Sequence, residues 1–351
     1  MTTPAQRISP CPQPFSDHVV DTIEGVDVTL RVFPGKFIEG GGKTPWLFWI
    51  HGGGWVGGKH YIPNVWVHPA FHPLGIHIIS VSYRFMPQAT LDDIYSDLSK
   101  SFQWCLDNLS SVLGEDKVDV QRYIIGGDSA GGQLSAHCAS HFQPKPLVEL
   151  NIFGAVDLTD PHFSKGMDRP IPYGTSSEEL ERLVRDFNPA NAVIASPWYW
   201  ELEPDMSQET LRSFWGTDYR PGEGDKKRMD LNAYTSKNGS RIKAMFHLLD
   251  SQGPEAEEEF KRLTKEWSPT YHLTKDYPPT VVMHGEKDQT VLIKQSKDFA
   301  DKLEKLGVEV KRIWSKDGGH SFEQSMGGPE DEGWEEFIVP CIEFVRKHTG
   351  V

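Results

Sequence analysis

The sequence predicts an α/β fold in which a mostly parallel central sheet is flanked by helices on both faces. Two observations carry this prediction. Short apolar runs recur between turn residues, and they are continuous rather than alternating, as expected of parallel strands buried on both faces. Between them lie stretches with apolar residues three or four positions apart, which is the helical spacing. Strands that alternate with helices favour one parallel sheet, whose ligands bind beyond the carboxyl ends of the strands.

The predicted strands follow from the positions of the apolar runs. Five buried strands are expected at residues 46–50, 77–83, 123–125, 148–153 and 280–283. Two further strands are expected around residues 19–33. The alternation over residues 308–314 is less clean, which predicts a later and more exposed strand.

Two helices have clear boundaries. The first is predicted over residues 90–113, with Asp92 and Asp93 in its first turn and Gly114 at its end. The second is predicted over residues 292–306 and ends at Gly307.

The interval 161–266 breaks the rhythm of strands and helices and is rich in Pro, Trp, Tyr and charge. Because a structureless loop of this length is improbable, we interpret it as a helical cap inserted over the sheet. The domain organisation is therefore residues 1–160 as the first part of the core, 161–266 as the cap and 267–351 as the second part. Aromatic residues gather in the cap: Tyr173, Trp198, Tyr199, Trp200, Phe214, Trp215, Tyr219 and Phe246. They fit either a pocket for a bulky apolar or aromatic group or the cap's own core.

Composition excludes several functions. The net charge of −14 argues against nucleic acid or an anionic membrane surface as a partner, because such binding needs clusters of Lys and Arg. No run of about 18 apolar residues occurs, and the N-terminal stretch resembles no secretory signal, so we expect no membrane span and a cytoplasmic location. The oligomeric state stays open, with a homodimer as one option.

No metal or cofactor is expected. The four cysteines are widely spaced without CxxC pairing, which argues against a zinc site or a disulfide framework. His68 and His72 have a metal-like spacing, but Pro69 and Pro73 spoil a shared helical face.

The stretch 126–132, GGDSAGG, follows a predicted strand and precedes a helix of small residues. It contains G-x-S-x-G in the strand, turn and helix context in which the serine is held in a strained conformation with its hydroxyl exposed. Ser129 is therefore the predicted nucleophile. Proteases that share a similar GDSGG are all-β chains whose histidine precedes the serine, and the alternation of strands and helices here rejects that interpretation.

A serine hydroxyl needs a base that takes its proton and a carboxylate that orients the base. Asp288 follows the strand at 280–283, and His320 follows the strand at 308–314. The order Ser129, Asp288, His320 is the one that this arrangement of strands demands. Glu286 and Asp317 are rival acids, and Asp288 is preferred because the carboxylate must reach past its own turn.

The stretch 51–55, HGGGW, places three glycines directly after a buried strand. Acyl transfer develops negative charge on the carbonyl oxygen, which backbone N–H groups can stabilise if no side chain covers them. We expect Ala130, the residue after the nucleophile, to supply one donor and the loop Gly52, Gly53 and Gly54 to supply the others.

HGGGW with GDSAGG, a late aspartate and GGH resembles the hormone-sensitive-lipase-like branch of the α/β-hydrolases, which contains carboxylesterases and small lipases. The likeness covers roughly residues 18–160 and 267–348. It implies an oxyanion hole of Gly53, Gly54 and Ala130, with Gly52 as a further candidate. The chain departs from the branch in having only 50 residues before HGGG and in reading EKDQTV where DPLxD is common.

The predicted function is hydrolysis of a carboxylic ester of a small or medium-sized, apolar or aromatic molecule through an acyl-enzyme on Ser129. An amide, an N-formyl aryl amide or a lactone is an alternative substrate, because arylformamidases use a similar HGGxW. A hydrolase or acyltransferase that tailors a natural product is also open. A non-catalytic receptor is disfavoured, because the gibberellin receptor, which resembles this family, has lost the histidine that His320 matches.

Overall fold

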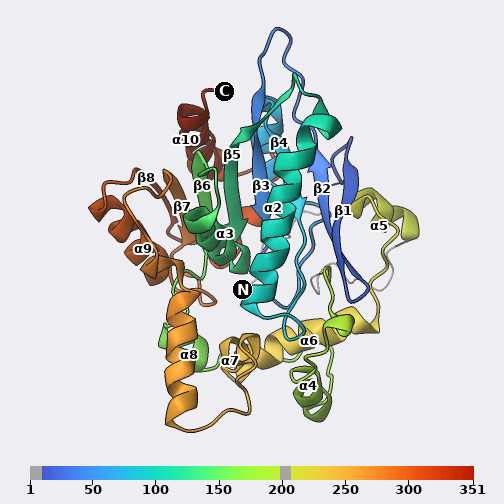
Figure 1. Cartoon of the computed structure of the whole chain (residues 1–351), viewed down its shortest axis with the longest axis vertical. Coiled ribbons are helices and arrows are strands. Elements are labelled where there is room, and N and C mark those ends of the chain that lie inside the picture. The colour runs from blue at the N-terminus through green and yellow to red at the C-terminus, as the bar shows by residue number, and fades with distance from the viewer. Residues whose placement is uncertain (1–9, 198–206) are drawn as a thin grey trace.

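The computed structural model describes residues 10–197 and 207–351 and contains one eight-stranded sheet in the order β1-β2-β4-β3-β5-β6-β7-β8 (Figure 1). The strands are β1 Ser16–Ile23, β2 Val26–Phe33, β3 Thr44–Ile50, β4 His77–Val81, β5 Val118–Asp128, β6 Val148–Ile152, β7 Thr280–Gly285 and β8 Val310–Ser315. Strands β3 to β8 pair in parallel, whereas β2 pairs antiparallel with both β1 and β4. The predicted mostly parallel α/β sheet is confirmed.

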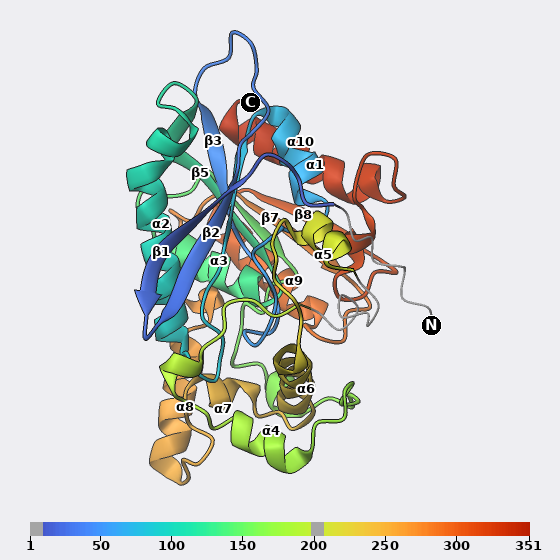
Figure 2. The same cartoon turned by 90° about the vertical axis from the view of Figure 1, so that its right-hand side faces the viewer.

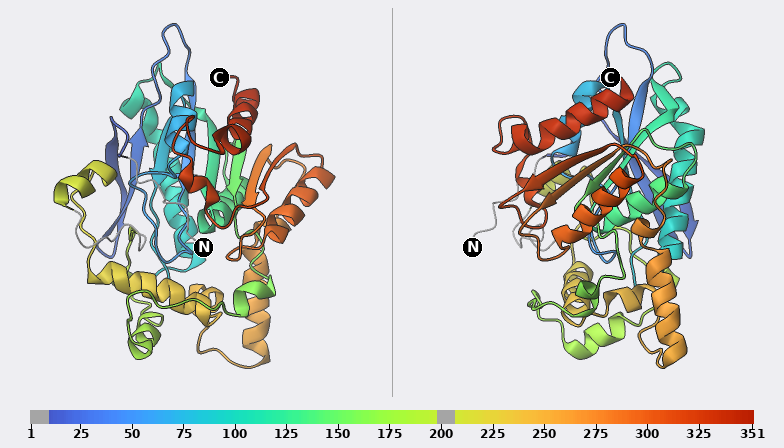
Figure 3. Two further views of the ribbon diagram at one scale, coloured as in Figure 1. Left: turned by 180° about the vertical axis from the view of Figure 1, so that it is seen from behind. Right: turned by 90° about the vertical axis from the view of Figure 1, so that its left-hand side faces the viewer.

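Helices cover both faces of the sheet. Helices α2 Leu91–Leu113, α3 Ala130–His141 and α9 Ile293–Lys305 lie on one face, and α1 Val67–Phe71 and α10 Val339–Thr349 lie on the other (Figures 1 and 3). Strand β3 shows why its apolar run is continuous. Phe48 packs on the face covered by α2, α3 and α9, Trp49 packs on the face covered by α1 and α10, and both are fully buried. Buried on two faces, such a strand has no polar side.

The ends of α2 follow the sequence pattern. The Thr90 hydroxyl accepts a hydrogen bond from the Asp93 amide at 3.2 Å, while the Asp93 carboxylate accepts one from the Thr90 amide at 2.9 Å. This reciprocal capping box fixes the first turn, and Gly114 follows the last.

Two differences from the expected strands have simple causes. Strand β5 is longer than residues 123–125, because its backbone pairing continues through polar residues and through the glycines that precede Asp128. Strand β4 ends at Val81, where its pairing with β3 and β2 stops, rather than at residue 83. Helix α1 was not predicted, since five residues are too few to show a helical period.

The interval 161–266 contains five α-helices in its described part, and none of its described residues joins the sheet. They are α4 Ser177–Leu183, α5 Gln208–Trp215, α6 Glu223–Lys237, α7 Arg241–Met245 and α8 Pro254–Glu266. Figures 1 and 2 show α4, α6, α7 and α8 beyond one end of the strands, whereas α5 lies beside β1 and β2.

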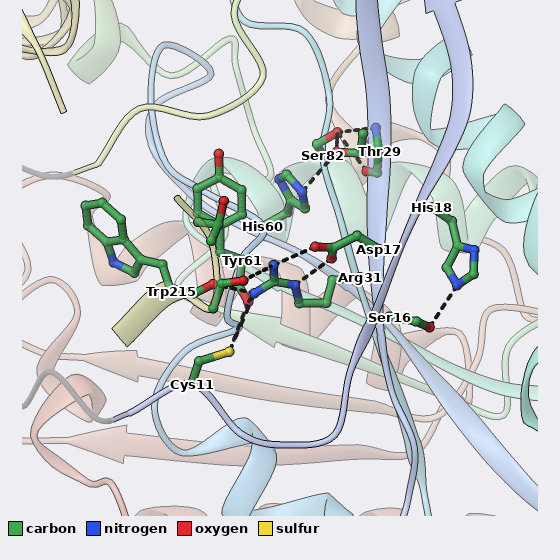
Figure 4. A network of polar contacts seen from close by, with 12 residues as sticks. Cys11, Ser16, Asp17, His18, Thr29, Arg31, His60, Tyr61, Ser82 and Trp215 are labelled. Carbon is green, nitrogen blue, oxygen red and sulfur yellow. Dashed lines mark hydrogen bonds and ion pairs between the residues drawn. The ribbon is translucent and has the colours of Figure 1, made fainter. Parts of the chain in front are cut away.

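A buried arginine attaches α5 to the sheet (Figure 4). Arg31 of β2 is fully buried and donates to both carboxylate oxygens of Asp17, at 2.6 and 2.7 Å. The same guanidinium donates to the carbonyl oxygens of Tyr61 at 2.9 Å and Trp215 at 2.5 Å. Because a buried charge is tolerated only when it is paired and hydrogen-bonded, this network fixes α5 at the edge of the sheet.

None of the helices in the described part of the chain has the length and apolar character that crossing a membrane requires. All four cysteines are buried free thiols. Burial raises the pKa of the Cys105 and Cys138 thiols well above the ordinary value, which makes them poor nucleophiles.

Candidate active site

Ser129 lies in the sharp turn between β5 and α3. Its φ of 53° and ψ of −116° are outside the usual regions for a residue with a side chain. The turn can form only because its neighbours lack side chains: a Cβ at Gly127 would lie 2.4 Å from the Ile50 carbonyl oxygen, and one at Gly131 would lie 2.1 Å from the same atom. The strained turn lifts the serine side chain to the carboxyl end of the sheet.

The structure brings Ser129, His320 and Asp288 together in one chain of hydrogen bonds. The distance from Ser129 Oγ to His320 Nε2 is 3.0 Å, and the distance from His320 Nδ1 to Asp288 Oδ2 is 2.6 Å. Both distances are within hydrogen-bonding range. The side chain of His320 is 22% exposed while that of Asp288 is fully buried, so the base faces solvent and the acid lies behind it.

Asp288 is surrounded by hydrogen-bond donors. Its Oδ1 accepts from the backbone amides of Thr290 at 2.7 Å and Val291 at 3.0 Å, while its Oδ2 is within 3.0 Å of His284 Nε2. Burial alone would raise the pKa of this carboxyl, but the charge of His320 and the hydrogen bonds from both histidines lower it well below the ordinary value. Asp288 is therefore an ionised acceptor throughout the neutral range.

His284 was not identified from the sequence. It is fully buried at the end of β7, and its Nδ1 lies 2.7 Å from the Ser296 hydroxyl of α9. Its Nε2 lies 2.9 Å from the Val291 carbonyl oxygen, so the Nε2–H faces two acceptors and Nδ1 accepts the serine proton. A histidine four residues before the predicted acid, at the end of a buried strand, was the available signal.

The rival acids point elsewhere. The Glu286 carboxylate lies 3.3 Å from Lys297 Nζ, and Asp317 forms an ion pair with Lys287. Both acids are exposed at the surface, where their ion pairs contribute little to stability. Their positions leave Asp288 as the carboxylate bound to His320.

The glycine loop after β3 lies next to the nucleophile. The amides of Gly53, Gly54 and Ala130 have no acceptor among the described residues, so they are available to a ligand. Gly52 is a correction, because its amide donates to Asp128 Oδ1 at 3.0 Å and cannot serve an oxyanion. A Cβ at Gly52 would also lie 2.4 Å from Asp128 Oδ2, so the glycine is needed for close packing.

His51 stiffens this loop and takes no part in proton transfer. Its Nδ1 donates to the Gly52 carbonyl oxygen at 2.7 Å, and its ring stacks on Tyr83 with centroids 4.6 Å apart. Burial lowers the pKa of His51 to about 4, which keeps the ring neutral at physiological pH. The loop is further tied to the cap region by a backbone bridge between Gly58 and Ser196.

Two buried carboxyl groups lie behind the site. Burial raises the pKa of Asp128 to about 6, and burial together with the charge of Asp128 raises that of Glu323 to about 8. Glu323 Oε1 accepts from Asn64 Nδ2 at 3.0 Å, whereas its Oε2 has no partner among the described residues. Glu323 is therefore most stable in its protonated form.

This arrangement predicts a pH-dependent difference in stability between the wild type and Glu323→Gln. The ordinary pKa of Glu323 is 4.5 and the folded value is about 8, so the folded state binds the proton more tightly. Its stabilising contribution is complete below pH 4.5 and is lost as the pH rises through about 8. As the pH rises from 4.5 to 8.5, the melting temperature of the wild type is expected to fall relative to that of Glu323→Gln. The exposed control Glu335→Gln should run parallel to the wild type, and a parallel Glu323→Gln curve would contradict the assignment.

Trp215, Tyr219 and Phe246 of the cap interval pack against other aromatic rings. Trp215 is buried within 6.5 Å of Tyr61 and 6.0 Å of Tyr219, and Phe246 lies 6.5 Å from Phe260, all measured between ring centroids. Trp198, Tyr199 and Trp200 are outside the described residues. Trp215 thus packs against Tyr61 outside the cap interval as well as against Tyr219 within it, whereas Phe246 and Phe260 both belong to the interval.

The imidazole rings of His68 and His72 stack with centroids 4.5 Å apart. Within residues 10–197 and 207–351, no group of three or more His, Cys, Asp or Glu side chains is arranged to hold a metal ion.

Comparison with known proteins identifies two matching families. A model described as the alpha/beta hydrolase fold matches residues 47–207, and one described as the prolyl oligopeptidase family matches residues 232–341. The two matches lie on either side of α5, and together they contain Ser129, Asp288 and His320.

Individual relatives are distant. The chain is 29% identical to carboxylic ester hydrolase LipN of Mycobacterium tuberculosis over 40% of its own length and 42% of LipN, so it spans less than half of that relative. It is 24% identical to probable carboxylesterase M8 of a Phoma species over 82% of both chains. A butyrate-bound esterase from Thermogutta terrifontis is 16% identical with a TM-score of 0.54 and covers 95% of this chain and 93% of its own, a likeness of fold.

Proposed function

We propose that this chain, which belongs to the α/β-hydrolase superfamily, is a serine hydrolase that cleaves carboxylic esters. One observation carries the proposal: Ser129 Oγ lies 3.0 Å from His320 Nε2, and His320 Nδ1 lies 2.6 Å from Asp288 Oδ2. A serine, a histidine and a carboxylate in this order form the unit that activates a hydroxyl for acyl transfer. Carboxylesterases among the relatives support the ester as the bond that is cleaved.

The reaction follows from the positions of these groups. Ser129 Oγ attacks the ester carbonyl carbon while His320 Nε2 takes the hydroxyl proton, and ionised Asp288 stabilises the resulting imidazolium. The negative charge that develops on the carbonyl oxygen is held by the amides of Gly53, Gly54 and Ala130. His320 then gives its proton to the departing alcohol, which leaves an acyl group on Ser129 Oγ.

The second half of the reaction uses the same groups with water as the attacking molecule. His320 takes a proton from water, the hydroxide oxygen attacks the acyl carbon, and the proton returns to Ser129 Oγ as the acid leaves. Each amide donor of an oxyanion hole contributes about 3 to 4 kcal/mol to the stability of the transition state. The bare glycines after β3 therefore carry a large share of the rate.

Pre-steady-state hydrolysis of 4-nitrophenyl butyrate tests the proposal. We expect a burst of nitrophenol equal to one equivalent per chain, followed by slower turnover, because an acyl-enzyme accumulates. A fluorophosphonate is expected to label one residue per chain, Ser129, and to abolish the burst. If the fluorophosphonate does not label the protein and none of a series of esters is turned over, the proposal is overturned. If N-formylaniline is turned over faster than every ester, the preferred substrate is an amide rather than an ester.

A further inference from the structure

Arg241, the first residue of α7, is a part-buried cation with neutral partners. Its Nη2 donates to the Ser236 hydroxyl and to the Asn232 carbonyl oxygen, each at 2.5 Å, and its Nε donates to the Thr235 hydroxyl at 3.3 Å. No carboxylate oxygen of the described residues lies within 4.0 Å of the guanidinium. The positive charge is thus held firmly in place but is not neutralised.

The guanidinium of Arg241 lies against the glycine loop. A Cβ built on Gly54 would lie 2.7 Å from Nη1 of Arg241 and 3.2 Å from the side-chain oxygen of Asn232. This Nη1 donates no hydrogen bond to any residue in 10–197 or 207–351. An unused donor that carries positive charge therefore lies beside the amides assigned to the oxyanion.

A second cation lies at the acid loop of the triad. Arg169 Nη2 donates to the Thr290 hydroxyl at 2.5 Å, and the Thr290 amide donates to Asp288 Oδ1 at 2.7 Å. Within the described ranges, Arg169 also has no carboxylate oxygen within 4.0 Å. Arg169 thus lies at the acid loop and Arg241 at the glycine loop.

The charges of the two arginines interact. Burial lowers the pKa of Arg241 to about 9, and the positive charge of Arg169 lowers it further. Burial also lowers the pKa of Arg169, although the negative charge of Asp288 acts in the opposite direction. The repulsion between two part-buried cations costs free energy, which an anion bound between them would offset.

Acidic partners are plentiful in this chain, which has 50 acidic and 36 basic residues. The buried Arg31 and Arg84 use them: Arg31 is paired with Asp17, and Arg84 with Asp97 at 2.8 Å. Among the described residues, Arg169 and Arg241 have no such partner, and in this they resemble Arg228 of α6, which donates only to neutral oxygens. Arg241 differs from Arg228 in its unused Nη1 beside the glycine loop. Because guanidinium groups bind carboxylates with two parallel hydrogen bonds, the missing partner is best supplied by a carboxylate that arrives with the substrate.

We propose that Arg169 and Arg241 bind a carboxylate carried by the substrate, so that the preferred substrates are half-esters of dicarboxylic acids or other esters with a free acid group. The proposal rests on the proposed esterase function and specifies its substrate class. The ester carbonyl lies at Ser129, and the two arginines bind the charged end of the same molecule.

Matched 4-nitrophenyl esters test this proposal. The neutral butyrate is compared with the half-esters of succinate, glutarate and adipate, whose free carboxyl is ionised at pH 7.5. The wild type is expected to show a higher kcat/KM for at least one half-ester than for the butyrate. In Arg241→Met and Arg169→Met, the ratio of kcat/KM for the best half-ester to that for the butyrate is expected to fall by about 10- to 100-fold.

Two further variants separate charge from structure. Arg241→Lys keeps the charge and is expected to retain more of the preference for the half-ester than Arg241→Met. The control is Arg182→Met, because the Arg182 side chain is 77% exposed on α4; its kcat/KM for both esters is expected to be unchanged. An unchanged ratio in both Met variants overturns the proposal, even if both absolute rates fall. A parallel loss for both esters would show that Arg241 supports the oxyanion rather than the substrate carboxylate.

A binding measurement keeps this test independent of turnover. Titration calorimetry on Ser129→Ala is expected to show that the best half-ester binds at least tenfold more tightly than the butyrate. Added salt should weaken the binding of the half-ester only. Equal binding of both esters contradicts the arginine assignment whether or not the wild type is an esterase. Failure of the neutral ester and of fluorophosphonate labelling, with preferential binding of the half-ester, would refute the catalytic proposal alone.

Discussion

Ser129→Ala is expected to lower kcat for 4-nitrophenyl butyrate by about five to six orders of magnitude. The variant lacks the oxygen that forms the acyl-enzyme, and no other hydroxyl contacts His320 among the described residues. The activity that remains over uncatalysed hydrolysis, about 10³- to 10⁴-fold, is expected from the oxyanion donors and from binding. The decrease in kcat is obtained from steady-state rates at saturating ester, measured on protein freed of wild-type contamination.

A matched serine provides the control. Ser135 is fully buried on α3, one and a half turns after Ser129, and donates to the Gly132 carbonyl oxygen at 3.1 Å. Ser135→Ala should retain ordinary turnover with a stability loss of about 1 kcal/mol. Because the triad acts as a unit, Ser129→Ala/His320→Ala should be little worse than Ser129→Ala. A Ser129→Ala enzyme with more than a hundredth of the wild-type rate would contradict the nucleophile assignment.

The sheet and the three triad residues could be predicted because each is marked by local chemistry. A strand buried on two faces must be continuously apolar, and a serine in a strained turn needs glycines around it. Chain order then limits the acid and the base to the loops after later strands. At Asp288, this reasoning also separates the carboxylate from Glu286, which lies only two residues away but faces Lys297.

The roles of Gly52 and His284 could not be predicted, because they depend on contacts between distant segments. Gly52 and Gly53 are neighbours in the same glycine run, and the hydrogen bond from the Gly52 amide to the Asp128 carboxylate distinguishes them. His284 acquires its role from Asp288 and from Ser296 on the next helix. A single sequence does not show which side chain will face which neighbour.

The structure of the cap was harder to predict from the sequence than the roles of these two residues. Its described α-helices range from five to 15 residues, and the longer two are rich in charged residues, so their apolar spacing predicts little beyond a helical insertion. The position of α5 depends on one buried network around Arg31, 184 residues before Trp215 in the chain. Arg169 and Arg241 likewise resemble ordinary surface arginines in the sequence, and only their contacts with Thr290 and with the glycine loop distinguish them.

The second large effect is expected for Asp288→Asn, with a fall in kcat of about 10⁴-fold at neutral pH. All four groups around the carboxylate are donors: the amides of Thr290 and Val291, and the ring nitrogens of His284 and His320. An ionised aspartate satisfies them because it only accepts. Asparagine must place its NH₂ group against either the two amides or the two rings.

Each orientation of asparagine has a distinct cost. With NH₂ toward the rings, His320 is forced to accept at Nδ1 and to carry its proton on Nε2, where it can no longer take the proton of Ser129. With NH₂ toward the loop, two buried amides lose their acceptor, which costs about 1 to 3 kcal/mol each and loosens the acid loop. The first orientation removes catalysis in a folded protein, so circular dichroism and fluorophosphonate labelling rates are measured together with kcat.

The rival acids supply controls with nearly the same change of charge. Asp317→Asn and Glu286→Gln each remove one carboxylate from the same end of the sheet, but both side chains are exposed and paired with lysines. We expect these variants to stay within about twofold of the wild type, since exposed ion pairs are worth little. If either lost as much activity as Asp288→Asn, the effect would come from the electrostatic field of the whole region rather than from the tautomer of His320. A large loss confined to Asp288→Asn, in a protein that still folds and binds the ester, requires the direct contact between this carboxylate and the imidazole.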